Sequence, residues 1–318
     1  MKPRLVFVHG VGGARDPAAE LDRWLGALEK GALASGHALR VPALIGAAAT
    51  DVRFAYYGDL FAAPEVQGGA ETEDIRFDDV HALLREAIHE RLAEHADDDG
   101  EVRVLHHAQA QLTPEGAVQG SGSVARQVLS AANTLLCVPG LRTFGRWASA
   151  RLMVGHLSQV ARYLARGEAD DAGLTLDARV RHRVTEELDP AVPTVLVAHS
   201  LGTVVAVEAL SGYLGEVPLL VTLGSPLGLH AMVGRRTRPQ PPRVPSAVVN
   251  WVNVWDRDDF IVGLPNLEDF FEPNDRSVLP DTRRVDSDGA WVHPALKYLA
   301  QPGAAGPIVG ALDAVAPS

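Results

Sequence analysis

Hydrophobic residues near the start of the chain form two short runs with a helical pattern between them. Residues 5–8 are all apolar, and the glycine-rich segment 9–13 follows them directly. A second, mostly apolar run covers residues 52–57. Between the two, apolar side chains recur at the three- and four-residue spacing of an amphipathic helix: Leu21, Trp24, Leu25 and Leu28. The pattern predicts a strand, a helix and a second strand.

The middle of the chain has helical periodicity. A helix is expected over residues 78–96, with the acidic run 97–99 and Gly100 stopping it. Two apolar helices are expected on either side of Pro139-Gly140, and Cys137 is expected to be buried in the first of them. The pair His106-His107 is expected near the end of a strand. The apolar positions that carry the two helices are Val124, Val128, Leu129, Leu135 and Leu136, then Trp147, Leu152, Val154, Leu157 and Leu164.

Strands and helices alternate regularly in the last third of the chain. A helix is predicted to end near residue 188, and residues 194–198 then form a nearly continuous β-branched run. Such a run is typical of a strand that is buried on both faces. A helix to about residue 213, a strand at 219–223, a loop at 235–245 and a strand at 248–255 follow. This alternation predicts the α/β class with a mostly parallel sheet flanked by helices.

Composition and charge narrow the possible partners. The chain has 29 basic and 40 acidic residues and a net charge of −11, which argues against nucleic acid as a partner. No apolar run is long enough to predict a transmembrane helix. A single cysteine excludes an intramolecular disulfide, so a cytoplasmic location is expected. No metal site is expected, because the segment beginning His89-Glu90 has Ala93 where a zinc-protease helix needs its second histidine.

One serine stands between the buried strand at 194–198 and the helix after it. Ser200 has Ala198 two residues before it and Gly202 two residues after it. A nucleophile elbow turns so sharply that larger side chains at these two positions would collide with neighbouring backbone. Ala198 stands where the usual pattern has glycine. The segment predicts that Ser200 is a nucleophile, and the alternative is an ordinary turn with an N-capping serine.

Three segments together resemble α/β-hydrolases of the lipase and serine-esterase kind. They are His9-Gly10-Val11-Gly12, Ala198-His199-Ser200-Leu201-Gly202 and Thr222-Leu223-Gly224-Ser225-Pro226, each following a predicted strand. The resemblance implies one α/β-hydrolase domain over residues 1–318. It also implies that Ser200 attacks a carbonyl while the backbone N–H groups of Val11 and Leu201 hold the oxyanion. Taken alone, the first segment is equally compatible with a loop that cradles phosphate.

A serine nucleophile needs a general base and an acid that orients it. In this fold the chain order is serine, acid, histidine, which leaves His230 and His293 as candidates for the base. His230 precedes the end of the next strand, where the acid is expected. His293 follows it in a polar loop, so His293 is the predicted base; a surface or N-capping histidine is the alternative.

Three carboxylates compete for the role of the acid. Asp256, Asp258 and Asp259 all follow the predicted strand at 248–255. The segment resembles the Trp-x-Asn-x-x-Asp-x-x-Asp-Pro-Val stretch of related esterases, with phenylalanine in place of the proline. This register implies that Asp259 is the acid, that Asp256 caps the turn and that Asp258 is solvated.

The predicted helices over about residues 118–166 form an insertion, and they are a candidate lid over the active site. An apolar lid would favour a small-molecule or lipid-like ester substrate. The alternative is that these helices simply pack on the hydrolase core. The sequence predicts a serine hydrolase that acts on an ester or thioester and needs no cofactor. An acyltransferase, cyclase or thioesterase with the same triad, and a non-catalytic binding module, are the alternative functions.

Overall fold

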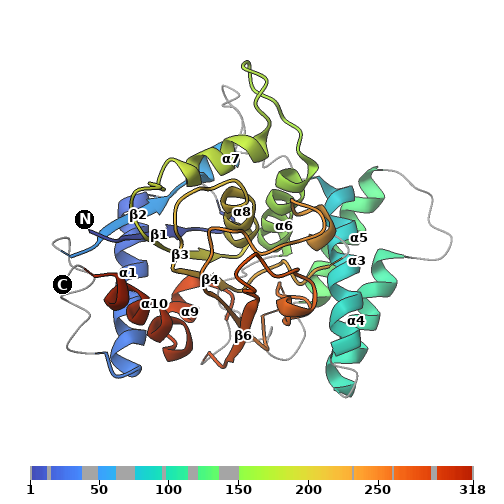
Figure 1. Cartoon of the computed structure of the whole chain (residues 1–318). Helices are drawn as coiled ribbons and strands as arrows, with labels where there is room; N and C mark the ends of the chain where they lie inside the picture. The colour runs from blue at the N-terminus through green and yellow to red at the C-terminus, as the bar shows by residue number, and fades with distance from the viewer. Residues whose placement is uncertain are drawn as a thin grey trace.

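The computed structural model describes residues 2–12, 16–37, 49–61, 76–94, 98–113, 121–135, 150–230, 233–259, 261–287 and 292–316. Within these residues six strands pair in parallel in one sheet, in the order β2-β1-β3-β4-β5-β6 (Figure 1). The expectation of an α/β fold with a parallel sheet is therefore confirmed. The strands are β1 (Arg4–Val8), β2 (Asp51–Ala55), β3 (Thr194–His199), β4 (Leu219–Leu223), β5 (Trp251–Asp256) and β6 (Pro280–Val285).

Helices cover both faces of the sheet. In β1, Leu5 and Phe7 face one side and Val6 and Val8 the other, and each pair belongs to a separate buried core. Figure 1 shows α1, α9 and α10 together on one side of the sheet, and α7 and α8 on the other. The bounds are α1 (Pro17–Ala34), α7 (Leu176–Thr185), α8 (Leu201–Leu210), α9 (Ala295–Leu299) and α10 (Pro302–Val315). Because both faces are covered, the central strands are mostly apolar.

A stretch of helices lies between β2 and β3. It begins with α3 (Phe77–Glu94), α4 (Asp99–Leu112), α5 (Ser121–Leu135) and α6 (Ala150–Ala165), and ends with α7. It therefore extends beyond the predicted insertion at 118–166 in both directions. In Figure 1, α3, α4 and α5 form a group beyond one end of the sheet. Their buried side chains belong to the same core as those of α8.

Helix α4 was not expected from the sequence. Asp98, which the pattern places in a helix stop, instead accepts hydrogen bonds from the N–H groups of Gly100 and Glu101, both over 3.1 Å, and so caps the start of α4. His106 and His107 lie on the exposed side of this helix, so their predicted position at a strand end is wrong. Cys137 and Trp147 lie outside the described residues.

Two elements near the C-terminus have no clear sequence signal. Strand β6 is the edge of the sheet and carries exposed Asp281, Arg283 and Arg284, so it lacks the apolar pattern of a buried strand. Helix α10 contains Pro307 and three glycines, which disfavour a helix. Burial of one of its faces, which includes Ile308, against the sheet outweighs this low propensity.

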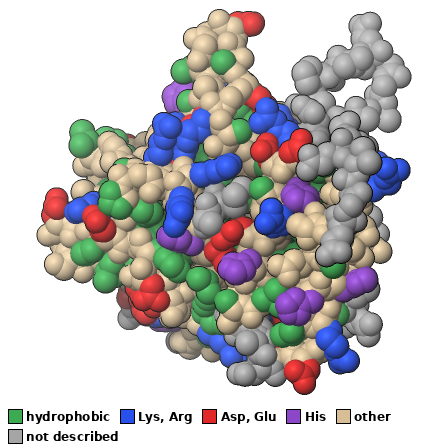
Figure 2. Space-filling view, turned by 90° about the vertical axis from the view of Figure 1, so that its right-hand side faces the viewer, with side chains coloured by type: hydrophobic (Ala, Val, Ile, Leu, Met, Phe, Trp, Pro, Cys, Tyr) green, Lys and Arg blue, Asp and Glu red, His purple; other side chains and the backbone are tan. Residues whose placement is uncertain are grey.

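The surface carries side chains of both charges. In Figure 2, Lys and Arg side chains gather in the upper part of the face shown, with Asp and Glu side chains next to them. In the part of the chain that the structure describes, no helix has both the length and the apolar character needed to cross a bilayer.

Candidate active site

Ser200 occupies a tight turn between β3 and α8. Its backbone has φ 52° and ψ −130°, a conformation that residues other than glycine rarely adopt. Two backbone hydrogen bonds hold the turn: the Ser200 N–H donates to the Leu223 carbonyl over 3.0 Å, and the Thr203 N–H donates to the Ser200 carbonyl over 2.9 Å. Such strain in a well-held turn is typical of a functional position.

Two glycines allow this turn to pack against the loop after β1. A Cβ atom at Gly202 would overlap the carbonyl oxygen of His9, and a Cβ atom at Gly10 would lie 2.6 Å from the Ser200 Cβ. Both positions therefore exclude a larger side chain. The close approach of the His9 carbonyl explains why a small residue is needed two positions after the serine. The contact also brings the loop after β1 directly against the serine, although the two are far apart in the sequence.

The three side chains predicted to act together form one hydrogen-bonded chain. Ser200 Oγ lies 3.0 Å from His293 Nε2, and His293 Nδ1 lies 2.8 Å from Asp259 Oδ2. Asp259 comes from the turn after β5, and His293 from the segment between β6 and α9. All three are buried, with at most 9% of the residue exposed. A hydroxyl, an imidazole and a carboxylate in this order can activate the hydroxyl as a nucleophile.

The surroundings of Asp259 favour its ionised form. Burial acts to raise the pKa of this carboxyl group, but the neighbouring charge of His293 and three hydrogen bonds outweigh it, and the pKa lies below its usual value. Among those contacts are hydrogen bonds from the Tyr298 hydroxyl over 2.7 Å and from the Ile261 N–H over 3.0 Å. Asp259 is thus held as an anion next to the imidazole.

The other two carboxylates have different surroundings. Asp256 accepts from the N–H groups of Asp258 and Ser287, over 3.0 and 2.7 Å, and so ties the turn after β5 to the chain after β6. Burial raises the pKa of Asp256 despite these bonds. Asp258 is exposed. Of the three, the structure brings Asp259 to His293.

Two histidines outside the predicted triad lie on the segments that meet at the serine. His199 Nε2 lies 2.6 Å from the main-chain carbonyl of His293, and the two rings are 4.8 Å apart. Because a carbonyl only accepts, His199 must carry a proton on Nε2. His9 stacks on Tyr57 and accepts a hydrogen bond from the Tyr57 N–H over 3.0 Å. Sequence reasoning gave neither histidine a role, since each stands beside a glycine or serine motif rather than at a defining position.

The predicted oxyanion donors lie on the two segments that meet at the serine. Val11 follows Gly10 in the loop after β1. Leu201 is the first residue of α8, and the first N–H groups of a helix have no carbonyl partner within it. The next N–H in the loop, that of Gly12, donates to Gln159 Oε1 of α6 over 2.9 Å. Gln159 is a further residue that the sequence did not single out.

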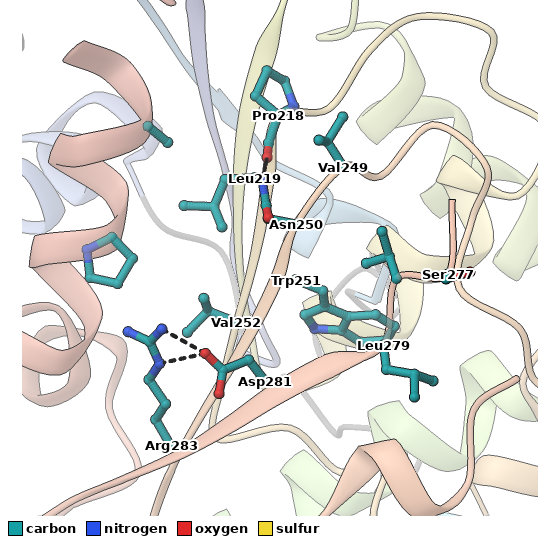
Figure 3. A pocket seen from close by; sticks show the side chains of 13 residues that line it. Pro218, Leu219, Val249, Asn250, Trp251, Val252, Ser277, Leu279, Asp281 and Arg283 are labelled. Carbon is teal, nitrogen blue, oxygen red and sulfur yellow. Dashed lines mark hydrogen bonds and ion pairs between the residues drawn. The ribbon is translucent and has the colours of Figure 1, made fainter. Parts of the chain in front are cut away.

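A cavity of about 570 Å³ lies elsewhere, at the opposite ends of the strands. Figure 3 shows its lining, which includes Leu219, Trp251 and Leu279, with Asp281 and Arg283 paired to each other. Leu219 and Trp251 are the first residues of β4 and β5, whereas Ser200 follows the last residue of β3. In a parallel sheet the first residues of the strands lie at one end and the last residues at the other, so the cavity is separate from the triad.

No family model, curated protein or solved structure matches the chain. Over the described residues, no group of three or more His, Cys, Asp or Glu side chains could hold a metal ion.

Proposed function

We propose that the protein is a serine hydrolase of the α/β-hydrolase kind, which cleaves a carboxylic ester or thioester through an acyl-enzyme. The observation that carries the proposal is the hydrogen-bonded chain from Ser200 Oγ through His293 to Asp259, with distances of 3.0 and 2.8 Å. The strained, closely packed turn at Ser200 is the second support, because an ordinary N-capping serine needs neither feature.

The acylation step follows from these positions. His293 Nε2 takes the proton of the Ser200 hydroxyl while Oγ forms a bond to the carbonyl carbon, and the carbonyl π electrons move to oxygen. The N–H groups of Val11 and Leu201 hold this oxyanion. Collapse of the intermediate expels the alcohol or thiol, which receives its proton from His293. Asp259 stays ionised and stabilises the imidazolium throughout.

Deacylation repeats the sequence with water. His293 removes a proton from the water, the hydroxide oxygen bonds to the acyl carbon, and Ser200 leaves with the proton returned from His293. Water is the only second substrate, so the reaction needs no cofactor. The predicted lid over about residues 118–166, which includes α5 and α6, has apolar side chains that favour an apolar acyl group.

Hydrolysis of a p-nitrophenyl ester series from short to long acyl chains tests the proposal. Ser200→Ala is expected to lower kcat by about 10⁴-fold or more. Ser211→Ala, on an exposed serine just past the other end of α8, is the matched control and keeps the wild-type rate. A fluorophosphonate probe adds a second readout: Ser200 Oγ bonds to phosphorus, fluoride leaves, and the mass increase is found on Ser200.

Equal rates for the wild type and Ser200→Ala, together with no labelling, would overturn the proposal. Adding a primary alcohol or amine as acceptor separates hydrolysis from acyl transfer. Release of free acid alone, whatever acceptor is offered, supports hydrolysis, whereas product that forms only with an acceptor would assign the triad to an acyltransferase.

A further inference from the structure

Helix α6 carries a buried amide among mostly apolar side chains. Gln159 is 6% exposed and lies between Leu157 and Val160, which pack in the core. Its Oε1 accepts the hydrogen bond from the Gly12 N–H, over 2.9 Å, across 147 residues of sequence. A buried amide costs free energy unless it is hydrogen-bonded. The bond therefore fixes the amide and the glycine loop with respect to each other.

The hydrogen bond to Gly12 also restricts the conformation of the loop after β1. Gly12 has φ 143°, a conformation that side chains rarely allow, so the loop depends on outside contacts to keep one shape. Holding the Gly12 N–H fixes the peptide plane between Val11 and Gly12. The adjacent peptide plane carries the Val11 N–H, which is the proposed oxyanion donor. The two planes meet at the Cα atom of Val11, so fixing the first reduces the freedom of the segment that carries the second.

The same side of α6 is tied to the helix that follows the nucleophile. Tyr163, one turn after Gln159, donates its hydroxyl proton to Glu208 Oε2 of α8 over 2.6 Å. Arg166, just past the end of α6, forms an ion pair with the same carboxylate. Gln159 and Tyr163, at positions i and i+4 of the helix, share one face. This face therefore links the loop that carries Val11 to the helix that begins at Leu201.

We propose that Gln159 is a positioning residue for the oxyanion site: it orients the Val11 N–H by holding Gly12, and helix α6 is thereby a structural part of the active site. The inference rests on the proposed function, because it assigns Val11 a role in an acyl-transfer reaction. It goes further because it identifies α6 as the part of the helical stretch that is fixed against the loop after β1, through the Oε1 atom of Gln159.

Gln159→Met tests it, because methionine keeps the bulk of the side chain and removes the acceptor. Ser158→Ala is the matched control: Ser158 is the preceding residue on α6, is equally buried, and accepts a hydrogen bond from the Arg76 N–H just before α3. Gln159→Met is expected to lower kcat about tenfold with little change in KM, since the donor is misplaced rather than deleted. Ser158→Ala keeps the wild-type kcat.

An inhibitor that forms an oxyanion gives a readout that a general loss of stability would not change. With an apolar trifluoromethyl ketone, Ser200 Oγ bonds to the carbonyl carbon, its proton moves to His293 and the carbonyl π electrons become the oxyanion. Gln159→Met is expected to weaken this inhibitor by the same factor as kcat/KM, as for a transition-state analogue. Wild-type kcat and inhibition in a folded Gln159→Met protein would overturn the inference while leaving the proposed hydrolase intact.

Amide hydrogen exchange on the wild type provides a test that needs no variant and no activity. The Gly12 N–H is expected to exchange at least about 100-fold more slowly than in an unfolded chain, because it is hydrogen-bonded. Exchange at the unprotected rate would overturn the inference. Protection of Gly12 in a protein that hydrolyses no ester would instead place the failure in the proposed function.

Discussion

The Tyr298 hydroxyl donates a hydrogen bond to Asp259 Oδ2 over 2.7 Å, at the same carboxylate oxygen that faces His293 Nδ1. Burial, together with the charge and hydrogen bond of Asp259, raises the pKa of Tyr298 well above its ordinary value, so the phenol keeps its proton and remains a donor. It also accepts from the Asp256 N–H over 3.1 Å. Tyr298 therefore shares the negative charge of Asp259 with His293 and ties together the turn that carries both aspartates.

Removing the phenol hydroxyl is expected to change the pH dependence of the reaction. In Tyr298→Phe, Asp259 loses one donor, and its charge acts more strongly on the imidazolium of His293. The acid limb of the kcat/KM profile should therefore move to higher pH, while kcat at the plateau changes by less than about tenfold. Profiles of wild type and variant from pH 4 to 9 measure this. A limb that stays in place or moves to lower pH contradicts the expectation.

Asp259 and its exposed neighbour offer a direct comparison of roles. Asp259→Asn keeps the shape of the side chain but removes the charge and disfavours the tautomer that delivers the serine proton. Its kcat on the best p-nitrophenyl ester should fall by about 10³ to 10⁴-fold. Asp258→Asn makes the same chemical change at the exposed neighbouring residue, and it should keep the wild-type kcat. Similar losses in both variants would remove Asp259 from the triad.

The lowered pKa of Asp259 also predicts how the stability of the protein depends on pH. A carboxyl group whose pKa is lower in the folded state stabilises the fold at pH values above its unfolded pKa, about 3.9, and this contribution is lost as the pH falls through the folded pKa. The free energy of unfolding of Asp259→Asn should therefore approach that of the wild type as the pH falls below about 4. Urea titrations across this range measure it, and a constant difference would argue against the shift.

The tight packing at Gly202 predicts a large cost for one added methyl group. Gly202→Ala would overlap the His9 carbonyl, and it is expected to destabilise the protein by about 1–3 kcal/mol and to disturb the turn at Ser200. Gly26→Ala is the matched control, since Gly26 lies in the interior of α1 with open space around it. There the substitution should stabilise by about 0.5–1 kcal/mol through helix propensity. Thermal unfolding distinguishes the two, and equal effects would contradict the packing argument.

Glu208 is the centre of a buried ionic network that joins α6, α7 and α8. Its carboxylate pairs with Arg166 and Arg181 and is 2% exposed at the side chain. Glu208→Gln leaves these cations undercompensated, so a loss of about 3 kcal/mol is expected. Glu272→Gln removes a surface partner of Arg243 and should cost less than about 1 kcal/mol. A similar small loss in both variants would show that the network adds little.

Local sequence patterns were sufficient to predict the strands and helices whose burial makes their sequences strongly apolar. The strands β1, β3, β4 and β5 and the helices α5 and α6 lie close to their predicted positions, because continuous apolar runs and helical spacing specify them without reference to neighbours. Strand β6 and helix α10 have no such pattern. Their stability comes from pairing at the sheet edge and from packing on α1 and the sheet, which a local window does not contain.

The sequence by itself determined the α/β class, the parallel sheet and the short list of chemically suitable residues around Ser200, since these depend on spacing and residue type along the chain. Only the tertiary structure decided which carboxylate reaches His293, that Tyr298 and His199 hold this pair in place, and that Gln159 meets the loop after β1. Each of these contacts joins residues 34 to 147 positions apart. Hydrogen bonds act over about 3 Å in space, and the folding of the whole chain sets those distances.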